Sequence, residues 1–267
     1  MPQKNNIPTI YFIGVIAWAI SNAGHEIIGH GLTCVLLGYE ALGVSTSFLI
    51  YNEIEVSFWD NKLIIIGGTL FNICVFLFSY FILKKQIIKN IHLKYFFWIL
   101  MCFNIFYSGS YIMGWFFGPT LDSALFMVGF EYPIVLKITL SLLGLAVIIL
   151  GFQVSSRTLH QIVDSKSNNF GKRLTTLTFY PYIAAITIKV LAGLMNQSDD
   201  KMLVVLGSFG ATGIFLVWIN FIRFWPKLKP SKELVPYISV DTKWITSGII
   251  IMLIYVFILG RGIGQIQ

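Results

Sequence analysis

Apolar residues fall into seven long blocks that are separated by short polar segments. In chain order the blocks are Ile7–Leu37, Leu63–Leu83, Tyr95–Phe117, Ile134–Phe152, Tyr180–Met195, Met202–Ile222 and Trp244–Leu259. A helix needs about 20 consecutive apolar residues to cross the hydrocarbon core of a bilayer. The pattern therefore predicts an all-α fold, a polytopic transmembrane helical bundle of about six or seven spans.

The first block, Ile7–Leu37, is longer than a bilayer requires, so we expect this helix to tilt or to break. Gly24, Gly29 and Gly31 are the positions at which a distortion costs least, because glycine tolerates the widest range of backbone conformations.

The polar segment after the first block has strand character. Ser45–Tyr51 and Ile54–Trp59 are rich in β-branched and aromatic residues, and the polar pair Asn52-Glu53 lies between them. Two such runs around a polar break are typical of a hairpin. We predict a short edge β-hairpin after the first span, with Asn52-Glu53 at its turn.

Composition agrees with a membrane protein. Of 267 residues, 56% are hydrophobic and 12% are charged, whereas soluble domains carry about 25% charged residues. The net charge of +7 could indicate nucleic-acid binding. The positive residues lie in short loops between apolar blocks, however, where they act as determinants of topology. We therefore expect a lipid bilayer as a partner, and no nucleic acid.

Loop charges alternate along the chain and predict an orientation. The second, fourth and sixth loops are basic, with Lys84, Lys85, Lys89, Lys94, Arg157, Lys166, Lys172, Arg173, Arg223, Lys227, Lys229, Lys232 and Lys243. The first, third and fifth loops hold most of the acidic residues. Basic loops stay in the cytoplasm. We expect an integral multi-pass protein of a prokaryotic plasma (inner) membrane, with its N-terminus in the cytoplasm.

The segment His25-Glu26-Ile27-Ile28-Gly29-His30 places three ionisable side chains inside the first apolar block. Burying such groups at membrane depth costs about 2.5 kcal/mol or more each, so they usually mark a functional site. Two histidines and a glutamate within one or two helical turns are also how zinc hydrolases arrange metal ligands and a general base.

The spacing of the two histidines constrains the local backbone. In a regular α-helix, residues five apart diverge by about 140°, whereas residues four apart differ by about 40°. His25 and His30 therefore bind one metal only if the helix contains a π-type turn, which Gly29 would ease. In a regular helix the pair on one face is Glu26 with His30 instead.

Three motifs together resemble the site-2 protease family of membrane-embedded zinc metalloproteases. The HExxxH segment followed by Gly31-Leu32 looks like a variant of the family's zinc helix. Gly67–Asn72 resembles its glycine-and-asparagine segment, and Pro119–Ser123 resembles its Leu-Asp-Gly motif. The resemblance covers roughly Ile10–Met127, in which motif order and spacing agree. A soluble dipeptidyl peptidase family binds zinc through a similar HExxxH motif.

The resemblance implies a role for each matching residue. His25, His30 and Asp122 would bind Zn, with water in the open fourth position. Glu26 would be the catalytic general base for peptide hydrolysis. Asn72 would donate a hydrogen bond to the substrate backbone or to the oxyanion. The substrate would be a membrane protein or a membrane-associated peptide, which the edge hairpin could bind as an extended strand.

The resemblance also divides the chain. Residues 1–132 would form the metalloprotease core, and residues 133–267 would be accessory transmembrane helices. The loop charges place His25, His30 and Asp122 towards the outer face, whereas the family carries its site nearer the cytoplasm. The sequence gives no prediction of oligomeric state.

Other interpretations of the histidine cluster remain open at this stage. His25, Glu26 and His30 could form a buried polar cluster without a metal. They could instead serve as the coordination or proton-relay site of a transporter. Such proteins often contain paired repeats, and the second half of the chain has no counterpart of the motif. A protease-like scaffold that has lost activity is the third alternative.

Individual residues also have simpler explanations. Asp122 could cap a helix, in which case Asp60 or Glu53 could replace it as the third ligand. Asn72 could hydrogen-bond between helices without a catalytic role. Lys189 could extend its amine to a membrane face, or it could be a counter-charge in a cavity.

Overall fold

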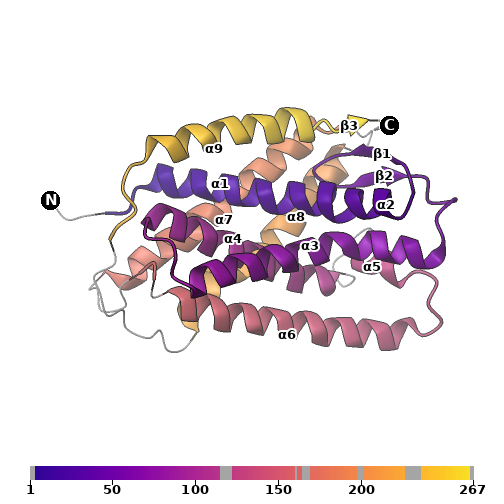
Figure 1. Ribbon diagram of the computed structural model, residues 1–267, viewed down its shortest axis with the longest axis horizontal. Helices are drawn as coiled ribbons and strands as arrows, with labels where there is room; N and C mark the ends of the chain where they lie inside the picture. Colours follow the sequence, from indigo (N-terminus) through magenta and orange to yellow (C-terminus); the bar gives the residue numbers. More distant parts are fainter. Residues whose placement is uncertain are drawn as a thin grey trace.

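The structure is a computed structural model that describes residues 4–114, 122–159, 161–163, 169–197, 201–225 and 236–264. Within those residues it contains seven helices that are long and apolar enough to cross a membrane. The elements are α1 Ile7–Ala23, η1 Gly24–Leu32, α2 Thr33–Leu36, β1 Ala41–Val44, β2 Leu49–Tyr51, α3 Phe58–Lys84, α4 Ile91–Ile112, α5 Asp122–Met127, α6 Pro133–Leu159, α7 Phe170–Met195, α8 Lys201–Leu216, η3 Val217–Phe224, α9 Thr242–Ile254, η4 Tyr255–Leu259 and β3 Ile263–Gly264 (Figure 1).

The predicted fold class is confirmed, since each of the seven apolar blocks becomes one membrane-competent helix. The first block forms one continuous helical span over Ile7–Leu36. The predicted end of the third block, Phe117, lies outside the described residues.

Polar side chains mark where several helices begin. Asn6, Ser57 and Asn90 each accept a hydrogen bond from a backbone N–H in the first turn of α1, α3 and α4. Asp241 does the same for α9. The first N–H groups of a helix have no partner within the helix, so these caps satisfy donors that would otherwise lack one.

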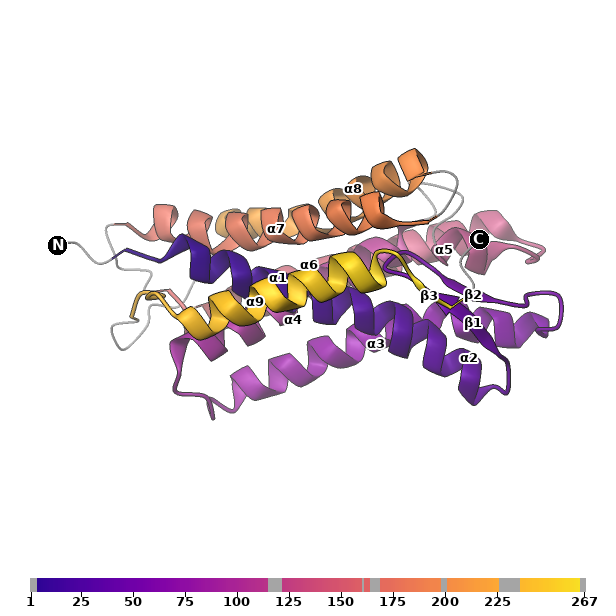
Figure 2. The ribbon, with the colours of Figure 1, turned by 90° about the horizontal axis from the view of Figure 1, so that it is seen from above.

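The helices α1 and α4 form the centre of the bundle. α1 packs against α4, α7 and α9, and α4 packs against α1, α3, α6 and α8 (Figures 1 and 2). Trp18 of α1 meets the rings of Phe103 and Tyr107 of α4 edge to face, with centroids 6.0 and 5.2 Å apart. Asn104 Nδ2 also donates to Ser21 Oγ over 2.8 Å. This contact anchors the helix that carries His25 and His30.

The predicted hairpin exists, but its turn was predicted at the wrong place. β1 pairs antiparallel with β2, so the turn is Ser45–Phe48 rather than Asn52-Glu53. Asn52–Val56 forms turns instead, and Ser57 then begins α3. The strand propensity of Ile54–Trp59 is overridden because Ser57 caps the helix. β3 near the C-terminus pairs with the other side of β1, giving the order β2-β1-β3.

The two ends of the bundle differ in what they carry. The N-terminus lies at one end, and the sheet, α5 and the C-terminus lie at the opposite end (Figure 1). His25 and His30 belong to η1, which is followed along the chain by α2 and then by strand β1.

Candidate metal centre

The helix that carries the two histidines changes its hydrogen bonding at the HExxxH segment. α1 is an ordinary α-helix, and the next nine residues, Gly24–Leu32, form a π-helix. Residues five apart lie on one face of a helix with i→i+5 hydrogen bonds. The π-type distortion predicted from the histidine spacing is therefore confirmed, and it turns both imidazoles to the same side.

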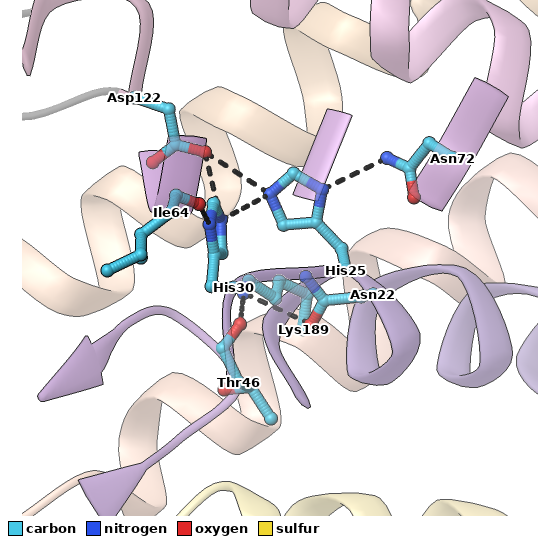
Figure 3. A network of polar contacts seen from close by, with 8 residues as sticks. All are labelled: Asn22, His25, His30, Thr46, Ile64, Asn72, Asp122 and Lys189. Atoms are coloured by element: carbon cyan, nitrogen blue, oxygen red, sulfur yellow. Dashed lines mark hydrogen bonds and ion pairs between the residues drawn. The ribbon is translucent and has the colours of Figure 1, made fainter. Parts of the chain in front are cut away.

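Three side chains converge at this face (Figure 3). His25 Nε2 lies 3.2 Å from His30 Nε2. Asp122 Oδ2, from α5, lies 3.3 Å from His25 Nε2 and 3.1 Å from His30 Nε2. Of the described residues, these three form the group of histidine, cysteine and acidic side chains that could hold a metal ion.

The separations of these atoms fit a common metal. Ligand atoms about 2.0–2.1 Å from zinc in a tetrahedral arrangement are about 3.3 Å apart. The observed separations of 3.1–3.3 Å match that edge. The three side chains could therefore supply three donors to a tetrahedral metal ion.

His30 is oriented for metal binding by the backbone of α3. Its Nδ1 lies 2.7 Å from the carbonyl oxygen of Ile64, to which it donates a hydrogen bond. A proton on Nδ1 leaves a lone pair on Nε2, the atom that faces Asp122 and His25. Metal-binding histidines commonly have this arrangement.

His25 is held in a similar way by Asn72 of α3. Asn72 Nδ2 lies 3.1 Å from His25 Nδ1, while Asn72 Oδ1 is buried without a partner. The amide oxygen and nitrogen are interchangeable by a side-chain flip. With the amide turned by 180°, Oδ1 would accept a hydrogen bond from His25 Nδ1–H, and His25 Nε2 would keep its lone pair. Asn72 thus lies behind the His25 ring, away from Asp122 (Figure 3).

Glycines let the π-helix η1 approach α3 closely. A Cβ at Gly29 would lie 2.4 Å from Gly68 Cα, and one at Gly67 would lie 2.3 Å from Gly29 O. A Cβ at Gly68 would lie 2.5 Å from His25 Cε1 and 2.6 Å from His30 Nε2. Gly29 and Gly67 therefore serve the helix contact, whereas Gly68 makes room for both imidazoles.

Asp122 is positioned by a residue that the sequence did not single out, Lys62 of α3. The Lys62 amine is buried and donates to the carbonyl oxygens of Leu125 and Val128, over 2.9 and 2.8 Å. These carbonyls lie at the C-terminal end of α5, where a positive charge is favoured. Burial acts to raise the pKa of Asp122, but the charge and hydrogen bonds of His30 and His25 hold it below its usual range.

Glu26 points into open space beside the cluster. It is 3% exposed, and among the described residues its carboxylate has no hydrogen bond or ion pair. It lines two cavities, of about 290 and 110 Å³, and Asp122 lines both as well. A carboxylate without a partner, in a cavity that reaches a metal ligand, is available to accept a proton.

Lys189 of α7 lines the larger of these cavities and does not extend to a membrane face. Its side chain is 4% exposed, and its amine donates to Asn22 Oδ1 over 3.3 Å and to the backbone oxygen of Thr46 (Figure 3). Of the two interpretations, Lys189 therefore lies in a cavity, and Glu26 lines the same cavity.

Neither of the two alternative third ligands joins the metal-binding group. Asp60 accepts hydrogen bonds from Tyr39 and Ser57 at the start of α3. Glu53 lines the smaller cavity but is not part of the metal-binding group. Pro119, Thr120 and Leu121, which carry the resemblance before Asp122, lie outside the described residues.

Comparison with known proteins identifies no relative: no protein-family model, no curated protein and no solved structure matches this chain.

Proposed function

We propose that this protein is a membrane-embedded, zinc-dependent endopeptidase that hydrolyses peptide bonds of membrane-associated substrates. The observation that carries the proposal is the juxtaposition of three metal-binding atoms, 3.1–3.3 Å apart, with an unpartnered carboxylate, Glu26, in the adjoining cavity. A purely structural polar cluster would pair Glu26 with a donor, because an unpaired charge buried at membrane depth is costly.

Two imidazoles and one carboxylate are a donor set that zinc hydrolases use. A zinc ion bound by His25, His30 and Asp122 would supply Lewis acidity, which makes a water molecule more acidic and polarises the scissile carbonyl. Ile64 supports the choice of a divalent metal, since its carbonyl accepts from His30 Nδ1 and frees Nε2 for coordination, and Asn72 would do the same for His25 with its amide turned.

Glu26 then acts as the general base. It accepts the proton of the attacking water and passes it to the leaving amine, so that peptide-bond cleavage is balanced without any further reagent. The π-helix supports this role as well as metal binding. It accommodates the additional residue of the HExxxH motif, which supports an active site over a scaffold that has lost activity.

The β-sheet supports binding of an extended substrate. β2 is at the edge of the order β2-β1-β3, and Leu49 and Tyr51 of β2 line the smaller cavity with His30 and Asp122. A substrate strand that pairs with β2 would run past the metal centre. A helical substrate must unwind before its peptide bonds are accessible, and strand pairing would stabilise the unwound form.

We further propose that the N-terminus is cytoplasmic and that the metal centre opens towards the outer face of a prokaryotic plasma membrane. Basic residues supply the support for this orientation. Lys84, Lys94, Lys172 and Lys243 lie at helix ends that belong to the second, fourth and sixth loops, and basic loops are retained in the cytoplasm.

The deciding experiment is Glu26→Gln compared with the unchanged protein. A peptidase requires that the variant keeps its metal and loses hydrolysis of a fluorogenic peptide panel, by about 10²-fold or more. A transporter or proton relay would instead show altered ion flux in proteoliposomes and no hydrolysis by either protein. Metal content is measured on the same samples, so that a loss of activity through loss of metal is recognised.

A further inference from the structure

The larger cavity beside Glu26 has a defined size and a defined set of charged residues in its wall. Its volume of about 290 Å³ is at the small end of ligand sites, which run from about 300 to 1,000 Å³. The wall includes Tyr107 and Tyr111 of α4 and, from α8, the apolar residues Leu203, Val204 and Ala211. The space therefore suits a ligand of one or two amino-acid residues with an apolar side chain.

Once a divalent metal is bound, the formal charges in this cavity do not sum to zero. Of the described residues in its wall, the charged ones are Glu26, Asp122 and Lys189. The two carboxylates together balance a divalent cation, so Lys189 leaves one positive charge without a counter-charge. Buried charges are normally paired, and a ligand with a single negative charge would complete the balance.

Lys189 is fixed in a position suited to meet that ligand. Two of its three N–H groups donate to Asn22 and to Thr46, and no described residue accepts from the third. Asn22 lies four positions before Glu26, about one turn away along the same continuous helix. The ammonium is thus held near the proposed general base, at the wall of the same cavity.

From these observations the geometry points to Lys189 as the binding site for the terminal carboxylate of a peptide. On the proposed peptidase function, on which this inference rests, the enzyme would cleave close to a free C-terminus and release a short, apolar-ended product. The spacing between the metal and the Lys189 amine would then determine how far from the chain end the peptide is cleaved. Tyr107 and Tyr111, which line the same cavity, would contact the side chains between them.

The test measures binding rather than turnover, so that it does not depend on hydrolysis. Zinc-loaded Glu26→Gln protein in detergent is titrated calorimetrically with N-acetyl-Ala-Leu and with its C-terminal amide, which differ in the carboxylate alone. A charge-assisted hydrogen bond to Lys189 predicts that the acid binds at least about tenfold more tightly. In this background Lys189→Met should remove the preference, and Lys189→Arg should retain most of it.

Each contrary result overturns a defined part of the inference. Equal dissociation constants for acid and amide overturn it, whether or not the unchanged protein cleaves peptides. A preference that persists in Lys189→Met overturns the assignment to this residue. Hexanoate binding as tightly as the peptide acid would assign the site to a fatty acid and overturn peptide recognition. Zinc content and thermal unfolding of each variant show whether it is folded. If Lys189→Met does not fold, the comparison of acid and amide in Lys189→Arg still tests the inference.

Discussion

Gly68→Ala offers the sharpest test of the metal geometry, because it adds one methyl group at the point where the imidazoles meet α3. The added Cβ would lie 2.5 Å from His25 Cε1, 2.6 Å from His25 Nε2 and 2.6 Å from His30 Nε2. Ordinary contacts begin at 3.4 Å. Both rings must therefore move by about 0.8 Å, whereas metal–ligand distances tolerate about 0.2 Å.

We expect Gly68→Ala to weaken zinc binding at least about 100-fold, which corresponds to about 2.7 kcal/mol. The fold should tolerate the change, because alanine is favoured over glycine inside a helix by about 1 kcal/mol. Zinc affinity is measured by competition with a chromogenic chelator, and folding is measured by thermal unfolding in the same detergent.

Gly210→Ala is the matched control. Gly210 lies in α8, and a Cβ there would have no atom within 4 Å. The control should bind zinc as tightly as the unchanged protein. An unchanged zinc affinity in Gly68→Ala would refute the reasoning, since the imidazoles would then not converge beside Gly68. Equal losses in both variants would show that the effect is not specific to the site.

Three further variants test the surroundings of the metal. Asn72→Ala removes the partner of His25 Nδ1 and should lower zinc affinity about 10–100-fold, as measured by the same competition; an unchanged affinity would show that Asn72 does not hold His25 for the metal. Lys62→Met removes two hydrogen bonds that hold α5, so zinc affinity should fall while Lys62→Arg largely preserves it. If Lys62→Met binds zinc normally, Asp122 is held by other contacts. Glu26→Gln should keep full zinc content and abolish hydrolysis, and activity in this variant would exclude Glu26 as the base.

Much of the fold follows from the sequence, because in a bilayer hydrophobicity dictates where helices run. All seven apolar blocks became membrane-competent helices, since backbone groups in lipid must be satisfied within a segment. The π-helix could also be predicted, because two histidines five residues apart can meet on one face only if the α-helical repeat is interrupted.

The sequence failed where contacts depend on distant segments. The hairpin turn was misplaced because Ile54–Trp59 has strand propensity, which the helix cap at Ser57 overrides. For Lys189 the sequence could not decide between a membrane face and a cavity, because its partners, Asn22 and Thr46, are more than 140 positions away in the chain. No local sequence pattern predicts such a contact.

Lys62 shows the same limit for the site. In the sequence it is a single lysine near the start of an apolar block, a position typical of a solvated residue. In the structure it is buried and binds two carbonyls of α5, which presents Asp122. Its role depends on the contact between α3 and α5, so the role cannot be predicted from the sequence unless that contact is already known.

The central claim is that His25, His30 and Asp122 bind one metal ion. The most direct measurement is the zinc content of the purified, detergent-solubilised protein without chelators, compared with His25→Ala, His30→Ala and Asp122→Ala. The account predicts one zinc per chain in the unchanged protein and its loss in each variant. A folded protein that binds no zinc, or that keeps its zinc in all three variants, would contradict it.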